Sequence, residues 1–138
     1  MLQFNRDKRA GVQGLGKLKN FHDLSWAPNV LKSVDEVGAL PGTQPGAKRV
    51  LNGVIHETLL ALDEVERVIR YRIDDGPDAV SKNNVQEYIG EIRIFPVTDS
   101  DATYILWTSR WEDSKGGVPE FCNPIYRALL ADLKKTFA

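Results

Sequence analysis

Residues 56–73 are the stretch that most constrains what this chain can fold into. They read His-Glu-Thr-Leu-Leu-Ala-Leu-Asp-Glu-Val-Glu-Arg-Val-Ile-Arg-Tyr-Arg-Ile, and two long strands joined by a turn at Asp63-Glu64 fit this pattern. Glu57 is an acid at the start of an otherwise apolar run, and Tyr71 lies among arginines. We therefore expect a hairpin that forms one wall of a ligand cavity, with Glu57 and Tyr71 pointing inward.

The length and charge of the chain limit the classes of protein to which it can belong. Its 138 residues suit a single domain over residues 1–138, long enough to bury about two-thirds of the unfolded surface. The formal net charge of -1 gives no electrostatic reason to expect nucleic acid or an anionic membrane as a partner. No apolar run approaches the roughly 18 residues of a membrane span, and the first nine residues lack the apolar core of a secretory signal. We expect a cytoplasmic protein.

Turn signals divide the middle of the chain into strands. The loops at residues 38–46 and 74–78 combine glycine and proline, which favour turns. Six strand candidates lie between such loops with few helices among them, which predicts an antiparallel sheet. The most distinct candidates are residues 48–55, 56–63, 65–73, 85–97 and 103–111.

The N-terminal region has a weaker pattern. Leu2 and Phe4 alternate with polar neighbours, which would suit a short edge strand. Residues 29–34 are expected to form a turn that leads into a strand. Between these segments, apolar residues at three-residue spacing predict one or two short helices, weakened by glycines: Val12, Leu15, Leu18, Phe21 and Leu24.

The C-terminal segment changes to a helical period. Asn123-Pro124 resembles an N-cap followed by proline at the first helical position. A start near Pro119 would instead place Pro124 inside the helix, where proline should kink it. A sheet followed by one amphipathic helix predicts an α+β domain, with a gap that Gly90, Ala61 and Ala128 would widen. The apolar stripe consists of Phe121, Cys122, Ile125, Leu129, Leu133 and Phe137.

Several short patterns follow one another along the chain: Phe21…Trp26-x-Pro28, Gly46-x-x-Arg49, Glu57-x-Leu59…Asp63, Tyr71-x-Ile73, Tyr88, Thr103…Trp107-x-Ser109 and the C-terminal helix. Together they resemble the START-like, helix-grip superfamily (SRPBCC), and within it the polyketide cyclase/dehydrase and lipid-transport group, over roughly residues 15–137. The chain departs from that pattern at residues 1–14, which barely supply the usual first strand, and this leaves sheet closure and a homodimer open.

The resemblance implies an antiparallel curved sheet wrapped around a long C-terminal α-helix, with short N-terminal helices. It also implies a small hydrophobic or aromatic ligand in an internal cavity. Strand period places alternate residues on one face, and the resemblance indicates which face is inside. The inward sets would be Glu57, Leu59 and Ala61; Tyr71 and Ile73; Tyr88, Gly90, Ile92 and Ile94; and Ile105, Trp107, Ser109 and Trp111. The implied ligand-binding residues are Trp26, Arg49, Leu59, Ala61, Ile73, Tyr88, Gly90, Ile92, Trp107, Ser109, Ile125 and Leu129.

Glu57 and Tyr71 are the candidates for catalysis. A carboxylate on an apolar wall is desolvated, so its pKa rises and it suits general acid or base chemistry. Alternatively, Glu57 pairs with Arg49 across neighbouring strands as a structural ion pair. Tyr71 and Tyr88 would hydrogen-bond a ligand or complete the core with their hydroxyls at its edge. Arg49 would bind a ligand carboxylate or ketide oxygen, or lie solvated on its strand.

Metal and cofactor chemistry have little support in the sequence. The two histidines are His22 and His56, and His56 should face away from Glu57. The segment after His56 lacks the second histidine of a zinc-protease helix, and no nucleophile elbow occurs. Cys122 fits a small core residue better than a nucleophile. We expect no metal and no cofactor.

Two main functions remain open, with a third less favoured. The first is a polyketide cyclase or aromatase type of enzyme, in which Glu57 moves protons with Tyr71, Tyr88 or Arg49. The second is a carrier or sensor of a lipid or small molecule without turnover. In the third, ligand-induced closure of residues 38–46 or 50–56 would create a docking face for a partner protein.

Overall fold

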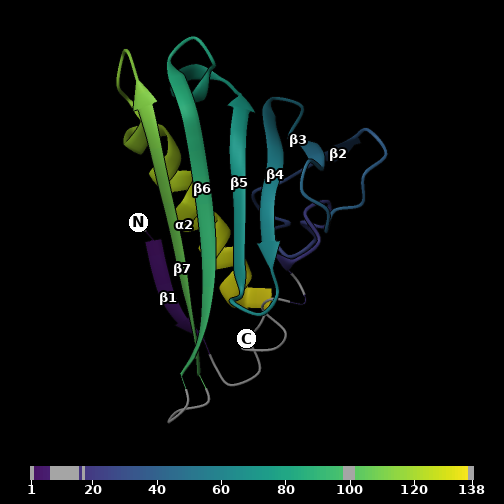
Figure 1. The fold of residues 1–138 in the computed structure, drawn as a ribbon. Helices are drawn as coiled ribbons and strands as arrows, with labels where there is room; N and C mark the ends of the chain where they lie inside the picture. Colours follow the sequence, from purple (N-terminus) through teal and green to yellow (C-terminus); the bar gives the residue numbers. More distant parts are fainter. Residues whose placement is uncertain (1, 7–15, 17, 98–101, 137–138) are drawn as a thin grey trace.

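A curved antiparallel sheet packed on one long helix forms the molecule (Figure 1). The computed structural model describes residues 2–6, 16, 18–97 and 102–136. In the sheet the strands lie in the order β1-β7-β6-β5-β4-β3-β2, and every neighbouring pair is antiparallel. The elements are β1 (Leu2–Arg6), β2 (Val34–Val37), β3 (Lys48–Leu51), β4 (Ile55–Asp63), β5 (Val68–Asp75), the short 3-10 helix η1 (Asp78–Val80), β6 (Val85–Val97), β7 (Ala102–Asp113) and α2 (Val118–Thr136).

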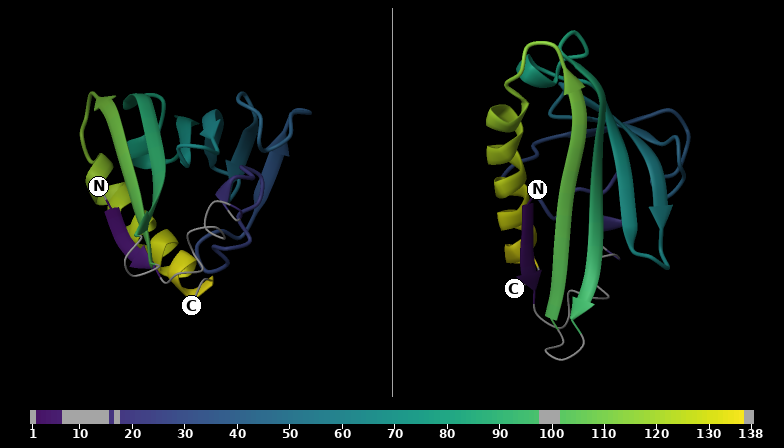
Figure 2. Two further views of the ribbon diagram at one scale, coloured as in Figure 1. Left: turned by 60° about the horizontal axis from the view of Figure 1, so that its bottom comes forward. Right: turned by 60° about the vertical axis from the view of Figure 1, so that its left-hand side comes forward.

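The helix α2 covers one face of this sheet (Figure 2). The two views show α2 running beside the long strands β6 and β7. From these strands the sheet curves round to its other edge, which β3 and β2 form. This confirms the expected α+β arrangement of a curved sheet around a C-terminal helix. In the described part of the chain, no helix is both long and apolar enough to cross a membrane.

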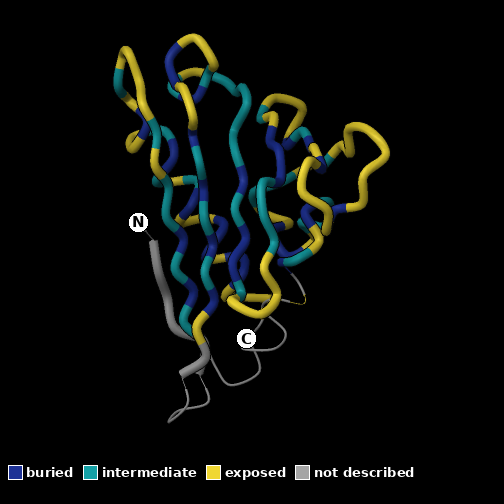
Figure 3. The backbone as a smooth tube through the Cα atoms, in the orientation of Figure 1, coloured by how far each residue is buried: buried dark blue, intermediate teal, exposed yellow. Residues whose placement is uncertain are grey.

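Strand alternation decides which side chains reach the core. Tyr71 is buried on β5, whereas its neighbours Arg70 and Arg72 are partly exposed. The pairs Tyr71 with Gly90 and Ile92 with Trp107 stand opposite each other across the strands. The predicted inward sets on β5, β6 and β7 therefore share the face that α2 covers, and Figure 3 shows burial concentrated along the middles of these strands.

Strand β4 departs from the predicted alternation. A β-bulge lies between Leu59 and Ala61, so that Ala61 stands opposite Arg70 and Leu62 stands opposite Ile69. Because a one-residue shift moves later side chains to the other face, Ala61 shares the outer face with Arg70. The prediction that Ala61 faces the cavity is wrong, and Leu62 packs against the core instead.

The helix α2 begins earlier than Asn123. Its first residue is Val118, it follows Gly116 and Gly117, both with positive φ, and the Phe121 N–H donates to the Gly117 carbonyl at 3.1 Å. The predicted start at Asn123-Pro124 is wrong, and the alternative start near Pro119, with Pro124 inside the helix, is confirmed. Because α2 includes both Cys122 and Tyr126, which are four residues apart, the two side chains share the buried side of the helix.

The N-terminal third is joined to the sheet and to α2. Strand β1 pairs with β7, so a first strand is present, and the predicted strand after residues 29–34 is β2. The short helices expected between Val12 and Leu24 fall mostly outside the described residues, and residues 21–31 form successive turns. Asp132 of α2 accepts hydrogen bonds from the backbone N–H and the side-chain amide of Asn29 at 2.9 and 2.7 Å.

Candidate functional site

A mainly apolar cavity lies between the sheet and α2. It measures about 70 Å³ as the space open to the centre of a water molecule, room for on the order of five waters. Apolar walls with a few polar groups are typical of small-molecule sites. The cavity is lined by Leu18, Phe21, Leu24, Trp26, Leu31, Arg49, Leu51, Ile55, Glu57, Ile69, Tyr71, Ile73, Val80, Ile92, Trp107, Phe121, Cys122, Ile125, Tyr126 and Leu129.

A buried ion pair forms one part of the cavity wall. Arg49 and Glu57 stand opposite each other on β3 and β4 and are 8% and 5% exposed. Oε1 of Glu57 accepts hydrogen bonds from Nε and Nη2 of Arg49 at 2.8 and 2.6 Å. Arg49 also donates from Nη1 to the Phe21 carbonyl, and its guanidinium lies 3.7 Å from the centre of the Phe21 ring. The two alternatives for Glu57 therefore coincide, since it pairs with Arg49 and lines the cavity.

Burial controls the protonation of Glu57. Removal from water raises the pKa of the Glu57 carboxyl above its usual value, and the charge and hydrogen bonds of Arg49 oppose that rise. A carboxyl in this position can exchange a proton closer to neutral pH than an exposed one.

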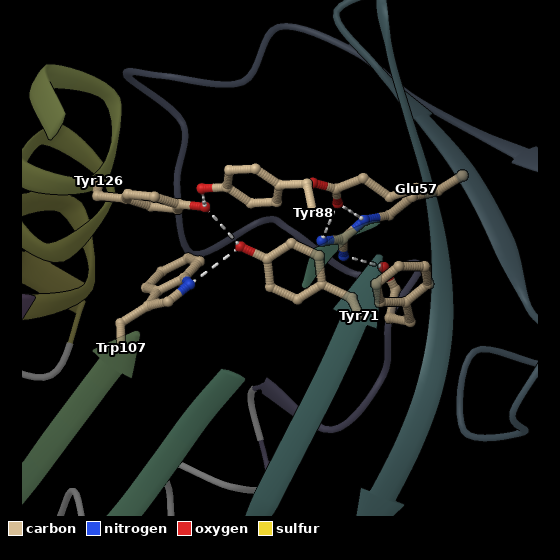
Figure 4. A network of polar contacts seen from close by, with 7 residues as sticks. Glu57, Tyr71, Tyr88, Trp107 and Tyr126 are labelled. Carbon is tan, nitrogen blue, oxygen red and sulfur yellow. Dashed lines mark hydrogen bonds and ion pairs between the residues drawn. The ribbon is translucent and has the colours of Figure 1, made fainter. Parts of the chain in front are cut away.

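Three tyrosine hydroxyls form a connected chain (Figure 4). The Tyr71 and Tyr126 hydroxyls are 3.0 Å apart, and Tyr126 also hydrogen-bonds Tyr88. Nε1 of Trp107 donates to the Tyr71 hydroxyl at 3.0 Å. Burial raises the pKa of all three tyrosines, so the hydroxyls stay protonated at neutral pH. These linked hydrogen bonds join β5, β6 and β7 to α2 through polar atoms inside an apolar core.

Most of the residues expected to contact a ligand do line the cavity: Trp26, Arg49, Glu57, Tyr71, Ile73, Ile92, Trp107, Ile125 and Leu129. Leu59, Gly90, Tyr88 and Ser109 do not, although they lie nearby. Leu59 is packed in the core, and Gly90 lies under the Tyr71 ring. Tyr88 reaches the site through its bond to Tyr126, and a hydrogen bond from Ser109 partly offsets the burial that raises the Tyr88 pKa.

Sequence reasoning missed several lining residues. Tyr126 is the most important, because its hydroxyl links Tyr71 to Tyr88. Tyr126 lies four residues after Cys122 and three before Leu129, so helical spacing could have placed it on the apolar stripe. Val80, on η1, follows no repeating pattern that would have revealed it.

The described residues offer no group of three or more histidine, cysteine or acidic side chains that would hold a metal ion. Cys122 lines the cavity, and burial raises the pKa of its thiol. A neutral thiol is a poor nucleophile.

Comparisons with known proteins identify the family. Residues 15–138 match the model of the family described as polyketide cyclase / dehydrase and lipid transport. The chain belongs to this family. No curated protein matches the chain closely enough to add to this assignment.

Solved structures show the same fold. A protein from Nitrosospira multiformis is 39% identical, with a TM-score of 0.91 over 99% of this chain and 95% of its own. The major latex-like protein 151 of Panax ginseng is 13% identical, with a TM-score of 0.77 over 99% and 95% of the two chains. A protein from Thermobifida fusca is 20% identical, with a TM-score of 0.77 over 99% and 91%. The last two similarities concern the fold alone.

Proposed function

We propose that this protein binds a compact hydrophobic or aromatic molecule in the cavity between its sheet and α2. The observation that carries this proposal is the cavity itself, which has apolar walls and one buried ion pair between Arg49 and Glu57. The cavity is small, with about 70 Å³ open to the centre of a water molecule, so a long acyl or polyketide chain would require the walls to move apart. The family description, which joins cyclases with lipid transport, supports a hydrophobic ligand.

A titration with toluene, followed by calorimetry, tests this proposal. Toluene should bind with saturation, and Leu129→Phe should abolish binding by filling the cavity that Leu129 lines. Ala128→Phe is the matched control, because Ala128 is exposed on the same helix and should leave binding unchanged. Saturable binding that survives Leu129→Phe would place the ligand elsewhere. Native mass spectrometry of the purified chain would add the mass of any molecule that co-purifies.

One observation supports a catalytic version of the same function. Glu57 is a buried acid with a raised pKa, and it lines the same cavity as Tyr71 and Tyr126. In a cyclase or dehydratase type of reaction, the Glu57 carboxylate would take a proton from the carbon next to a ligand carbonyl. One tyrosine hydroxyl would exchange its hydrogen bond to a neighbouring tyrosine for one to that carbonyl oxygen, as negative charge develops on the oxygen.

The variant Glu57→Gln separates an enzyme from a carrier. In an enzyme, the variant would still bind a ketone substrate but would form no product, because glutamine cannot take up the proton. In a carrier or sensor, no carbonyl compound that binds would be converted by the unaltered protein, and Glu57→Gln would alter affinity alone.

A further inference from the structure

Most of the polar groups that line the cavity already form hydrogen bonds within the protein. Among the described residues that line it, Arg49 and Glu57 are the charged ones. The Tyr71 and Tyr126 hydroxyls already bond to each other, to Trp107 and to Tyr88. A ligand that enters the cavity therefore finds few protein groups still seeking a hydrogen bond.

One oxygen of Glu57 is an exception. Nε1 of Trp26, which also lines the cavity, is a second group without a partner in the described part of the chain, but that atom is fully buried. Both hydrogen bonds from Arg49 end on Oε1, and nothing within the described residues donates to Oε2. Among those residues, the fully buried side-chain atoms that lack a partner are His22 Nδ1 and Trp26 Nε1. Oε2 is not among them, so it keeps open space beside it. Glu57 thus presents an unoccupied acceptor on an apolar wall.

Arg49 is poorly placed to hold an anionic ligand. One edge of its guanidinium is taken by Glu57, Nη1 is taken by the Phe21 carbonyl, and one face lies against the Phe21 ring. Arginine keeps its proton at all ordinary pH values, so an ionised Glu57 balances the buried charge. A carboxylate ligand would add a second negative charge next to Glu57 without a free cation to meet it.

We propose that the ligand carries a hydroxyl or N–H group that donates its hydrogen to Oε2 of Glu57, and that the site rejects carboxylate ligands. This inference rests on the proposed function, and it narrows the ligand class to neutral aromatic or alicyclic alcohols, phenols and N–H compounds. The apolar walls hold the ring, and the single acceptor orients it.

Two phenols of nearly the same shape test the direction of the hydrogen bond in the full chain. Chlorine and methyl groups are similar in size, but 4-chlorophenol has the more acidic hydroxyl and is the better donor. Near neutral pH, calorimetry should show 4-chlorophenol binding several-fold more tightly than 4-methylphenol, and 4-methylbenzoate binding at least about tenfold more weakly than either. Tighter binding of 4-methylphenol or of 4-methylbenzoate would overturn the inference.

The variant Glu57→Gln provides a second, independent test. Arg49 needs an acceptor, so the glutamine carbonyl should take the place of Oε1 and its NH₂ group the place of Oε2. The cavity would then offer a donor. Affinity for 4-methylphenol should fall about tenfold, affinity for toluene should stay within about twofold, and the acceptor 4-methylbenzaldehyde should bind more tightly than before. Glu112→Gln, on an exposed residue, should change none of these affinities.

The outcomes separate this inference from the function on which it rests. If toluene binds the unaltered protein but Glu57→Gln weakens toluene and 4-methylphenol equally, Glu57 acts through the fold alone and the donor inference is wrong. If toluene and both phenols fail to bind the unaltered protein, the proposed function fails and the inference falls with it.

Discussion

Tyr71 occupies its position because Gly90 has no side chain. The two residues stand opposite each other on β5 and β6, and a Cβ built on Gly90 would overlap the Tyr71 ring and hydroxyl. The ring therefore lies across the glycine backbone, and its hydroxyl reaches Tyr126 and Trp107. A glycine in a strand interior often marks such a close approach. Gly90 thus positions a cavity residue without lining the cavity.

We predict that Gly90→Ala destabilises the protein by about 1–3 kcal/mol, because the added methyl group forces the Tyr71 ring out of its place. Urea unfolding followed by circular dichroism measures the change. In a Tyr71→Ala background the same substitution should cost much less, since the clash is removed. An equal cost in both backgrounds would show that strand propensity, and not the Tyr71 ring, explains the glycine.

The two tryptophans of the cavity should respond differently to replacement by phenylalanine. Trp107 donates from Nε1 to the Tyr71 hydroxyl, whereas Nε1 of Trp26 is buried without a partner among the described residues. Trp107→Phe loses ring volume and a hydrogen bond, while Trp26→Phe loses ring volume and an unpaired donor. We predict that Trp107→Phe costs at least about 1 kcal/mol more in unfolding free energy than Trp26→Phe. Equal costs in urea unfolding would contradict the assigned hydrogen bonds.

At the scale of single residues, the chemical groups of the site could be predicted from the sequence better than the hydrogen bonds that join them. Glu57 stood out as an acid in an apolar run, and its partner Arg49 was predicted as one of two alternatives. The link through Tyr126 was missed, because a hydroxyl on the helix shows no sign in the sequence of the hydroxyls that it will meet. Such contacts depend on how strand and helix faces are brought together in space.

At the scale of elements, α2 fixes the position of the segment that contains Trp26. Asp132 binds Asn29 through both carboxylate oxygens, and the Thr136 hydroxyl donates to the Trp26 carbonyl at 3.0 Å. Because Trp26 and Leu31 line the cavity, these bonds hold one of its walls against the last turns of the helix.

We predict that Asp132→Ala lowers the unfolding free energy by about 1.5–3 kcal/mol, the usual cost of losing hydrogen bonds to a charged group. Asp132→Asn should cost less, because one carbonyl acceptor remains. Lys134→Ala, on an exposed residue of the same helix, is the control and should change stability by less than about 0.5 kcal/mol. If Asp132→Ala matched Lys134→Ala in urea unfolding, the bond to Asn29 would contribute nothing.

The types of the elements were easier to predict than the register of the strands and the start of the helix. The strands and the amphipathic helix followed from periods of two and about 3.6 residues, and the expected hairpin turn lies between β4 and β5. The bulge that turns Ala61 outward carries no local signal, because Leu60, Ala61 and Leu62 are all apolar. The sequence left two starts of α2 open, since proline suits both the first turn and, at a cost, the interior of a helix.

At the scale of the whole molecule, the tyrosine chain connects parts of the fold that are distant in sequence. Tyr71, Tyr88 and Tyr126 come from β5, β6 and α2, so the chain closes only when the sheet and the helix have assembled. Burial raises the pKa of each hydroxyl above its usual value. In the unfolded chain the same hydroxyls ionise near pH 10.

Alkaline pH should therefore unfold the protein through these groups. Below about pH 10 both states keep the three protons and pH has no effect through them. Above it the unfolded state releases protons that the folded state retains, so stability falls by up to about 4 kcal/mol per pH unit for three groups. Urea midpoints between pH 9 and 11 measure this slope, and Tyr126→Phe should reduce it by about one-third. An unchanged slope in Tyr126→Phe would show that the buried hydroxyls do not control alkaline stability. The same would follow if absorbance at 295 nm showed all four tyrosines ionising while the protein stayed folded.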